Sequence, residues 1–197
     1  FALIFPIGMT LYELWDERKF NFVALLGALN IGVTGGIALL QLDGPWFSVK
    51  EAAFPFLIGL FVLGSTWTEN SFFAKVLYNP FVFNIEKIEA ALGLTNSNLK
   101  FQSLLKSCNI LLAMSFFLSS FLNLVIALKV FVPIEGQVDA EAKASLLNAQ
   151  ISRMTYLGFI GIALPSLLIL VWLLYYFLNK LKKLTGLQLE DLLHSTE

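Results

Sequence analysis

The sequence predicts an all-α membrane protein, a polytopic bundle of transmembrane helices with five spans in this chain. Hydrophobic residues make up 57% of the 197 residues and charged residues only 14%, with a mean hydropathy of +0.76. This composition lies far from that of a soluble globular domain. The charged residues also fall between long uncharged runs, which is the pattern of segments that cross a bilayer.

The first two uncharged runs lie before residue 41. Residues 1–12 are apolar but short for a span, and further residues before Phe1 would complete it. Residues 22–40 form a run that is about 28 Å long as a helix, close to the hydrocarbon thickness of a bilayer. Small side chains share one face of this second run, and such a face lets another helix approach closely. The predicted helix-packing residues are Ala28, Gly32, Gly35 and Gly36.

Three more spans are predicted further along the chain. Residues 52–68 form the third, after a turn at residues 42–45 that contains Asp, Gly and Pro. Residues 107–128 form the fourth, and residues 154–179 form the fifth. The fifth is about 39 Å long as a helix and exceeds the hydrocarbon core, so we expect tilt or a bend at Pro165.

Short helices are also predicted in the polar connections. In the 69–106 connection, Asn84 is expected to cap a helix over residues 85–92 that ends at Gly93. The 129–153 connection is rich in alanine and has helical character. The tail, residues 184–197, carries a short amphipathic element. We treat the whole chain as a single transmembrane domain with these three appendages.

The distribution of Lys and Arg predicts the orientation in the membrane. Nine of the 13 lie on one predicted side, in residues 16–21, in the 69–106 connection and after residue 179. Four lie on the other side, in the 41–51 and 129–153 connections. The positive-inside rule places the first group, and with it the C-terminus, in the cytoplasm. A cytoplasmic N-terminus would then require a sixth span upstream of Phe1.

A set of polar side chains inside the spans offers a candidate site. Its members are Asn30, Cys108, Ser115, Ser119 and Asn123. The last four share one face of the fourth span, which is expected either to line a path or groove for a lipid headgroup or to form hydrogen bonds between helices. The second interpretation is favoured, because such bonds are ordinary in transmembrane bundles. The third and fifth spans begin on the outer side with charged residues, which are Lys50, Glu51 and Arg153. These residues are expected either to form an ion-pair cluster or to be interfacial charges that snorkel.

The sequence gives little basis for catalysis. The single histidine, His194, lies in the tail, and the single cysteine, Cys108, excludes an internal disulfide and a cysteine metal cluster. No ionisable residue lies in the middle of any predicted span, which argues against proton-coupled transport. We therefore expect no enzymatic activity, no cofactor and no metal. The basic residues form no stripe with interleaved aromatics, so nucleic acid is not an expected partner.

Motifs along nearly the whole chain resemble those of one protein family. They are Gly8-x-x-Leu11-Tyr12-Glu13, Gly35-Gly36-Ile37-x-Leu39-Leu40, Trp46-Phe47-x-x-Lys50-Glu51-Ala52-Ala53, Ile88-Glu89-Ala90-Ala91-Leu92, Ala163-Leu164-Pro165-Ser166 and Leu184-Thr185-Gly186-Leu187-x-Leu189-Glu190-Asp191. With these motifs the chain resembles a widespread family of bacterial inner-membrane proteins labelled intracellular-septation-protein-A-like, and sometimes major-facilitator-transporter-like. The resemblance implies a helical inner-membrane bundle with one further N-terminal hydrophobic segment, and it implies no reaction or ligand.

Two functional hypotheses follow. The first is a non-enzymatic membrane subunit or scaffold that binds a membrane-protein partner, or a second copy of itself, in cell-envelope maintenance or division. Its candidate partner-binding residues are Leu189, Leu192 and Leu193, which can share one face of the tail. The alternative is a carrier or binding protein for a lipid-like or uncharged small molecule, held by the polar face of the fourth span.

Overall fold

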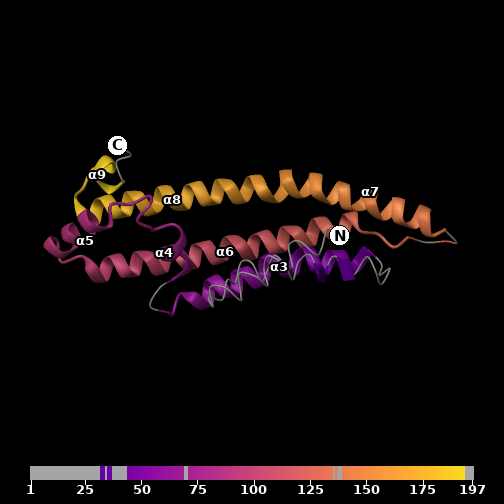
Figure 1. The fold of residues 1–197 in the computed structure, drawn as a ribbon, viewed down its shortest axis with the longest axis horizontal. Coiled ribbons are helices and arrows are strands. Elements are labelled where there is room, and N and C mark those ends of the chain that lie inside the picture. Colours follow the sequence, from indigo (N-terminus) through magenta and orange to yellow (C-terminus); the bar gives the residue numbers. More distant parts are fainter. Residues whose placement is uncertain are drawn as a thin grey trace, which may run out of the picture. The chain divides into compact units, whose positions relative to one another are not determined.

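All the regular elements that the structure describes are helices. The computed structural model describes residues 32–33, 35–36, 44–68, 71–134, 136 and 139–193 (Figure 1). The elements are α3 (Gly44–Ser65), α4 (Phe72–Val76), α5 (Ile85–Leu94), α6 (Asn98–Val130), α7 (Ala140–Gly158), the π-helical η1 (Phe159–Ala163), α8 (Leu164–Thr185) and α9 (Leu189–Leu192). The all-α fold class is thus confirmed for these residues. Most of the first two predicted spans, with Ala28 and Asn30, lies outside them.

Three helices are long and apolar enough to cross a bilayer: Pro45–Ser65, Asn98–Val130 and Glu141–Thr185. They correspond to the third, fourth and fifth predicted spans. The chain itself buries only 22%, 28% and 11% of the residues in their most apolar windows. Soluble proteins rarely leave apolar surface of this extent uncovered. These helices therefore have the length and the surface of a membrane protein.

Two of these helices begin earlier than the uncharged runs predict. Helix α3 starts at Gly44, because Pro45 has no N–H to lose in the first turn and its fixed φ suits a helix start. Helix α6 starts at Asn98, nine residues before the predicted span. Its first turns carry lysines, yet Phe101 and Leu104 on the same turns are buried. Packing of that apolar face extends the helix beyond its uncharged part.

The irregularity expected at Pro165 is present as a change of helix type. Helices α7 and α8 follow one another through the π-helical turn η1, which ends two residues before Pro165. Proline has no N–H to give to the carbonyl of Gly161, four residues earlier, and its ring crowds that carbonyl. A wider π turn at this point accommodates the missing hydrogen bond without ending the helix.

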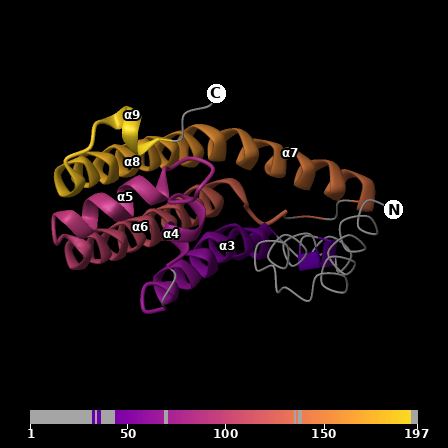
Figure 2. The same cartoon turned by 60° about the vertical axis from the view of Figure 1, so that its left-hand side comes forward.

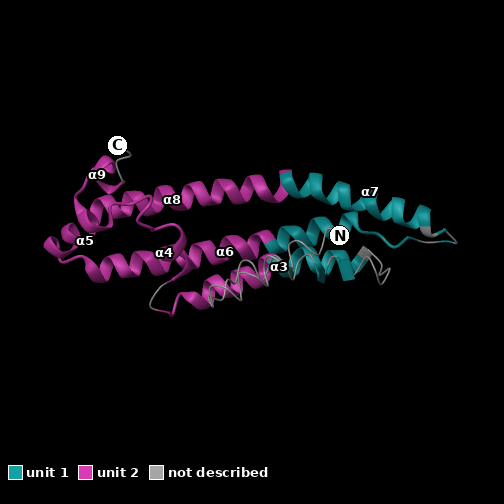
Figure 3. Ribbon diagram, in the orientation of Figure 1, with its two compact units in different colours: residues 1–54, 120–159 teal, residues 55–119, 160–197 magenta. Residues whose placement is uncertain are grey.

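The chain divides into two compact units, coloured in Figure 3. Unit 1 comprises residues 1–54 and 120–159, and unit 2 comprises residues 55–119 and 160–197. The long helices α3 and α6 contribute residues to both units. The largest cluster of buried hydrophobic side chains lies in unit 2.

The core of unit 2 forms where the short helices meet the ends of α6 and α8. Helix α5 contacts α8 and α9, and α8 also contacts α9 (Figure 2). At the centre of this core, the ring of Phe177 lies 5.2 Å from the ring of Phe73 and 5.8 Å from that of Phe83, both edge to face. Asn84 caps α5 as predicted, by accepting a hydrogen bond from the backbone N–H of Lys87. The helix runs one residue past Gly93, to Leu94.

Candidate functional site

Unit 1 contains a cavity of about 270 Å³ at α3, α6 and α7. Its polar lining residues come one from each helix, and they are Glu51, Asn123 and Thr155. Its other lining residues are Phe131, Ile151, Met154 and Gly158. This volume is near the lower limit of known small-molecule sites, which combine a mostly apolar lining with a few polar groups.

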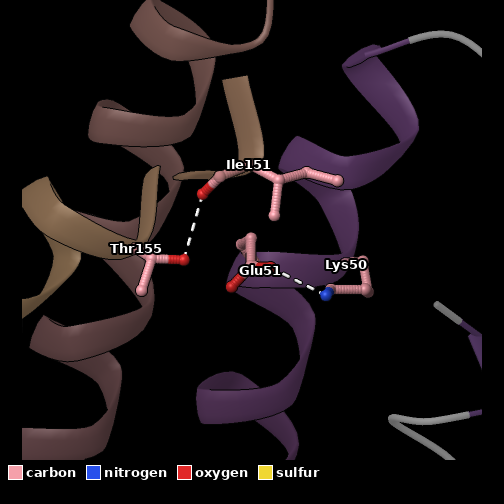
Figure 4. Close-up of polar contacts among 4 residues, drawn as sticks. All are labelled: Lys50, Glu51, Ile151 and Thr155. Carbon is pink, nitrogen blue, oxygen red and sulfur yellow. Dashed lines mark hydrogen bonds and ion pairs between the residues drawn. The ribbon is translucent and has the colours of Figure 1, made fainter. Parts of the chain in front are cut away.

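The carboxylate of Glu51 is the only charged group among the residues lining this cavity, and it is paired. Lys50 Nζ lies 2.7 Å from Glu51 Oε1 (Figure 4). The side chain of Lys50 is largely buried, whereas that of Glu51 keeps 30% of its surface exposed. Because the pair carries no net charge, it adds no net charge to the cavity. It offers oxygen acceptors beside an apolar surface.

Lys50 is held in place by the aromatic side chains behind the cavity. Its Nζ lies 6.0 Å from the ring centroid of Phe47, one helical turn earlier on α3. The ring of Phe47 stacks on that of Phe131 at 5.4 Å, and both side chains are buried. Phe131 itself lines the cavity. A cation close to an aromatic face is attracted by the ring quadrupole, so this stack helps to fix the Lys50–Glu51 pair.

Hydrogen bonds between helices hold the frame of the cavity. The hydroxyl of Ser120 on α6 donates to the carbonyl of Ala52 on α3 at 2.7 Å. The amide of Gln150 on α7 donates to the carbonyl of Val132, just after α6, at 3.1 Å. Each bond ties a neighbour of a lining residue to another element. Hydrogen bonds between elements therefore help to position the three polar lining groups.

Two backbone features affect the acceptors in the cavity. The hydroxyl of Thr155 donates to the carbonyl of Ile151 at 3.0 Å, so its lone pairs can accept from a ligand (Figure 4). Pro55 has no N–H to give to the carbonyl of Glu51, four residues before it on α3. A residue that lines the cavity thus has a carbonyl without its usual helical donor.

The structure separates the residues of the predicted polar face. Asn123 lines the cavity in unit 1, whereas Cys108 is fully buried in the core of unit 2. The hydroxyl of Ser115 donates to the carbonyl of Leu112 within its own helix. Ser119 is half-buried. Glu51 joins Asn123 in the cavity, but Arg153 is exposed and forms no ion pair with the residues described.

Sequence reasoning missed the most connected polar side chain of α6, Asn109. It is fully buried, and its Nδ2 donates to the carbonyl of Val62 at 2.7 Å and to the hydroxyl of Thr66 at 2.7 Å. Its Oδ1 accepts from the backbone N–H of Phe73 at 2.9 Å. Asn109 thereby joins α6 to the end of α3 and to α4. A lone amide in an apolar run was the available signal.

Of the predicted small-residue face, the structure describes Gly32, Gly35 and Gly36. A Cβ placed on Gly32 or Gly36 would meet no atom within 4 Å, and Gly35 is half-buried. On α3, another helix approaches closely at Gly59. There a Cβ would lie 2.8 Å from Cε1 of Phe117 and 3.3 Å from Cβ of Phe116 on α6.

The tail leucines pack largely against the chain itself. Leu192 is fully buried in the core of unit 2, and Leu193 is half-buried, whereas Leu189 is 42% exposed. The carbonyl of Leu192 accepts from the backbone N–H of Asn84 at 2.9 Å, and Asp191 lies 3.5 Å from Lys87. Leu192 is therefore used to dock the tail on α5.

Comparison with protein-family models, with curated proteins and with solved structures finds no match to this chain. The arguments about its function accordingly start from the cavity and from the surface of the described helices.

Proposed function

We propose that this chain is a non-catalytic integral membrane protein that binds an uncharged, lipid-like molecule in the unit 1 cavity. One observation carries the proposal: a cavity of about 270 Å³ whose lining combines Glu51, Asn123 and Thr155 with apolar residues. The neutral Lys50–Glu51 pair favours an uncharged head with hydroxyl or amide groups. The apolar lining suits a hydrocarbon segment.

The proposed setting is the bacterial inner membrane, with five spans in this chain, a sixth before Phe1 and a cytoplasmic C-terminus. The asymmetry of Lys and Arg between the two sides supports this orientation. In this topology Lys50 and Glu51 enter the third span from the outer side. The cavity would then admit a ligand from the outer leaflet.

The proposal is tested by removing the polar groups from the cavity while keeping its volume. Asn123→Leu with Thr155→Val is expected to reduce the copurified ligand about 25-fold, since each lost hydrogen bond weakens binding about fivefold. Small molecules extracted from protein purified in mild detergent are quantified by mass spectrometry relative to protein. Ser115→Ala, on α6 but away from the cavity, is the matched control. Equal ligand content in the double variant and the control would refute the proposal.

A second candidate is a membrane subunit or scaffold that binds a partner protein in envelope maintenance or division. It is favoured by three large apolar side chains of unit 2 that lie near short helices and turns. Phe81, Leu94 and Leu99 are 93%, 87% and 87% exposed. Replacing all three with serine should abolish copurification of a stoichiometric partner. A partner retained by the triple variant would exclude this surface.

A further inference from the structure

A second pocket, of about 320 Å³, lies in unit 2 between the first turns of α6 and the last turns of α8. It is lined by three cations and three side chains with hydroxyl groups. These are Lys100, Ser103 and Ser107 on α6, and Tyr176, Lys180 and Lys183 on α8. The remaining lining residues, Leu104 and Leu184, are apolar. The pocket therefore combines positive charge and hydroxyl donors with an apolar floor.

No carboxylate among the described residues forms an ion pair with the lysines of this pocket. Within the part of the chain that the structure describes, neither ion pair involves Lys100, Lys180 or Lys183. Three ammonium groups around one pocket repel one another. An anion bound among them would remove that repulsion.

The helix dipole explains only part of this arrangement. Lys183 lies in the last turn of α8, where a cation is favourable beside the unpaired carbonyls. Lys100 is the third residue of α6, and a cation at the start of a helix is unfavourable for the same reason. Binding of an anionic ligand would account for Lys100 at the start of this helix.

The surface of α8 next to the pocket points to a lipid. Lys180 Nζ lies 5.8 Å from the ring centroid of Tyr176, whose ring stacks on that of Trp172 at 5.9 Å. These three residues follow each other at one-turn intervals from the lysines into the apolar part of α8. Trp172 is half exposed. Tryptophan and tyrosine are typical of the interface between headgroups and hydrocarbon.

We propose that this pocket binds the phosphate of an anionic phospholipid, with the lysines on the phosphate and an acyl chain along Tyr176 and Trp172. Lys100, Lys180 and Lys183 supply the charge, and the Ser103 hydroxyl can donate to the headgroup, whereas the Ser107 hydroxyl already donates to the carbonyl of Ser103 at 2.9 Å. Basic pockets between transmembrane helices are suited to phosphate-bearing headgroups. Inorganic phosphate shares this chemistry but has no acyl chain to use the aromatic surface. This site is separate from the unit 1 cavity and does not depend on it.

The test compares two triple variants of equal charge in the full chain. One replaces Lys100, Lys180 and Lys183 with glutamine, and the control replaces Lys75, Lys106 and Lys182, which do not line the pocket. Protein in mild detergent is titrated with phosphatidylglycerol or with phosphatidylcholine, and bound lipid is measured by native mass spectrometry. Phosphatidylglycerol is expected to bind the pocket variant about 100-fold more weakly than wild type, because each lysine contributes about fivefold. The control variant is expected to stay within about threefold of wild type, since it keeps the pocket lysines.

Each other outcome overturns the proposal. An equal loss of phosphatidylglycerol binding in the two triple variants would show a general attraction between charges. No loss of binding in either variant would show that the pocket lysines do not bind the lipid. Phosphatidylcholine bound as tightly as phosphatidylglycerol would remove the role of net charge. Displacement of phosphatidylglycerol by millimolar inorganic phosphate would assign the pocket to the free anion. If the pocket variant fails to give a cooperative thermal transition, Lys100→Gln alone replaces it, with about fivefold weaker binding expected.

Discussion

Asn109 shows at the scale of one residue how a membrane helix can position its neighbours. Its side chain has no exposed surface and connects three elements through its two polar atoms. The N–H of Phe73 is one of the first orphan donors of α4. Asn109 satisfies this donor from another helix, so it fixes where α4 begins as well as how α3 meets α6.

Asn109→Ala is expected to lower the free energy of unfolding by about 2–4 kcal/mol. The substitution leaves the N–H of Phe73 and the hydroxyl of Thr66 without this partner, and each unsatisfied buried group costs about 1–3 kcal/mol. Equilibrium unfolding in mixed micelles measures the change. Ser115→Ala removes a hydrogen bond within one helix and should cost less than about 0.5 kcal/mol. Equal effects of the two substitutions would contradict the role assigned to Asn109.

Tyr78 makes stability depend on pH at the alkaline end. It lies between α4 and α5, outside the apolar helices, with its ring 5.3 Å from that of Phe101. Burial, with a smaller contribution from the Glu89 carboxylate, raises the pKa of Tyr78 from 10.0 to about 12. The folded state therefore holds the phenolic proton more tightly than the unfolded state. The corresponding stability is complete below pH 10 and is lost as the pH rises from 10 toward 12.

Tyr78→Phe is expected to remove this part of the pH dependence. Its hydroxyl is buried and has no hydrogen-bond partner among the described residues, so its loss should leave the thermal midpoint at about pH 8 unchanged or higher. Between about pH 10 and pH 12 the midpoint of the wild type should then fall more than that of the variant. Parallel curves for the two proteins would show that Tyr78 does not titrate differently in the folded state.

At the scale of helices, the crossing of α3 with α6 depends on a glycine. Gly59 faces the ring of Phe117, whereas a Cβ added to Gly64, five residues later on α3, would meet no atom within 4 Å. Gly59→Ala is expected to destabilise by about 1–3 kcal/mol, because the helices must separate or the ring must shift. Gly64→Ala should be neutral or stabilising by up to about 1 kcal/mol through helix propensity. Thermal unfolding in detergent distinguishes the pair, and the reverse order would refute this crossing.

The helices themselves were largely predictable, and their ends were not. Uncharged runs identified α3, α6 and α8 because hydrocarbon excludes charge. The start of α6 was missed because helix formation does not require the absence of charge, and Lys100 lies on turns whose other face buries Phe101. The cap at Asn84 was found because it depends on local sequence alone.

The cavity was predictable only in part. Asn123 was found because a helical wheel orders residues within one helix. Glu51 and Thr155 reach the same cavity from other helices, and no pattern within one helix gives the register between helices. Asn109 was missed because successive residues of a helix lie about 100° apart. This rotation takes Asn109 out of the polar face that contains its neighbour Cys108.

At the scale of the whole molecule, the length of the last helix has a consequence for topology. The helical stretch Glu141–Thr185 has 45 residues, about 68 Å, more than twice the hydrocarbon thickness of a bilayer. Its uncharged part is residues 154–179. If residues 154–179 cross the bilayer, the charged residues at 141–153 and the lysines after residue 179 belong to opposite sides of it. In the orientation proposed above, the first side is the exterior and the second is the cytoplasm.

Single cysteines test this orientation in a Cys108→Ala background. Ala90 on α5 and Ala144 on α7 are suitable positions, because both side chains are exposed. In intact cells, Ala144→Cys should react with a membrane-impermeant maleimide, whereas Ala90→Cys should react only after the membrane is opened. Both should react equally in detergent, which controls for local access. Labelling of Ala90→Cys but not Ala144→Cys in intact cells would reverse the orientation, and the basic pocket would then face the outer leaflet.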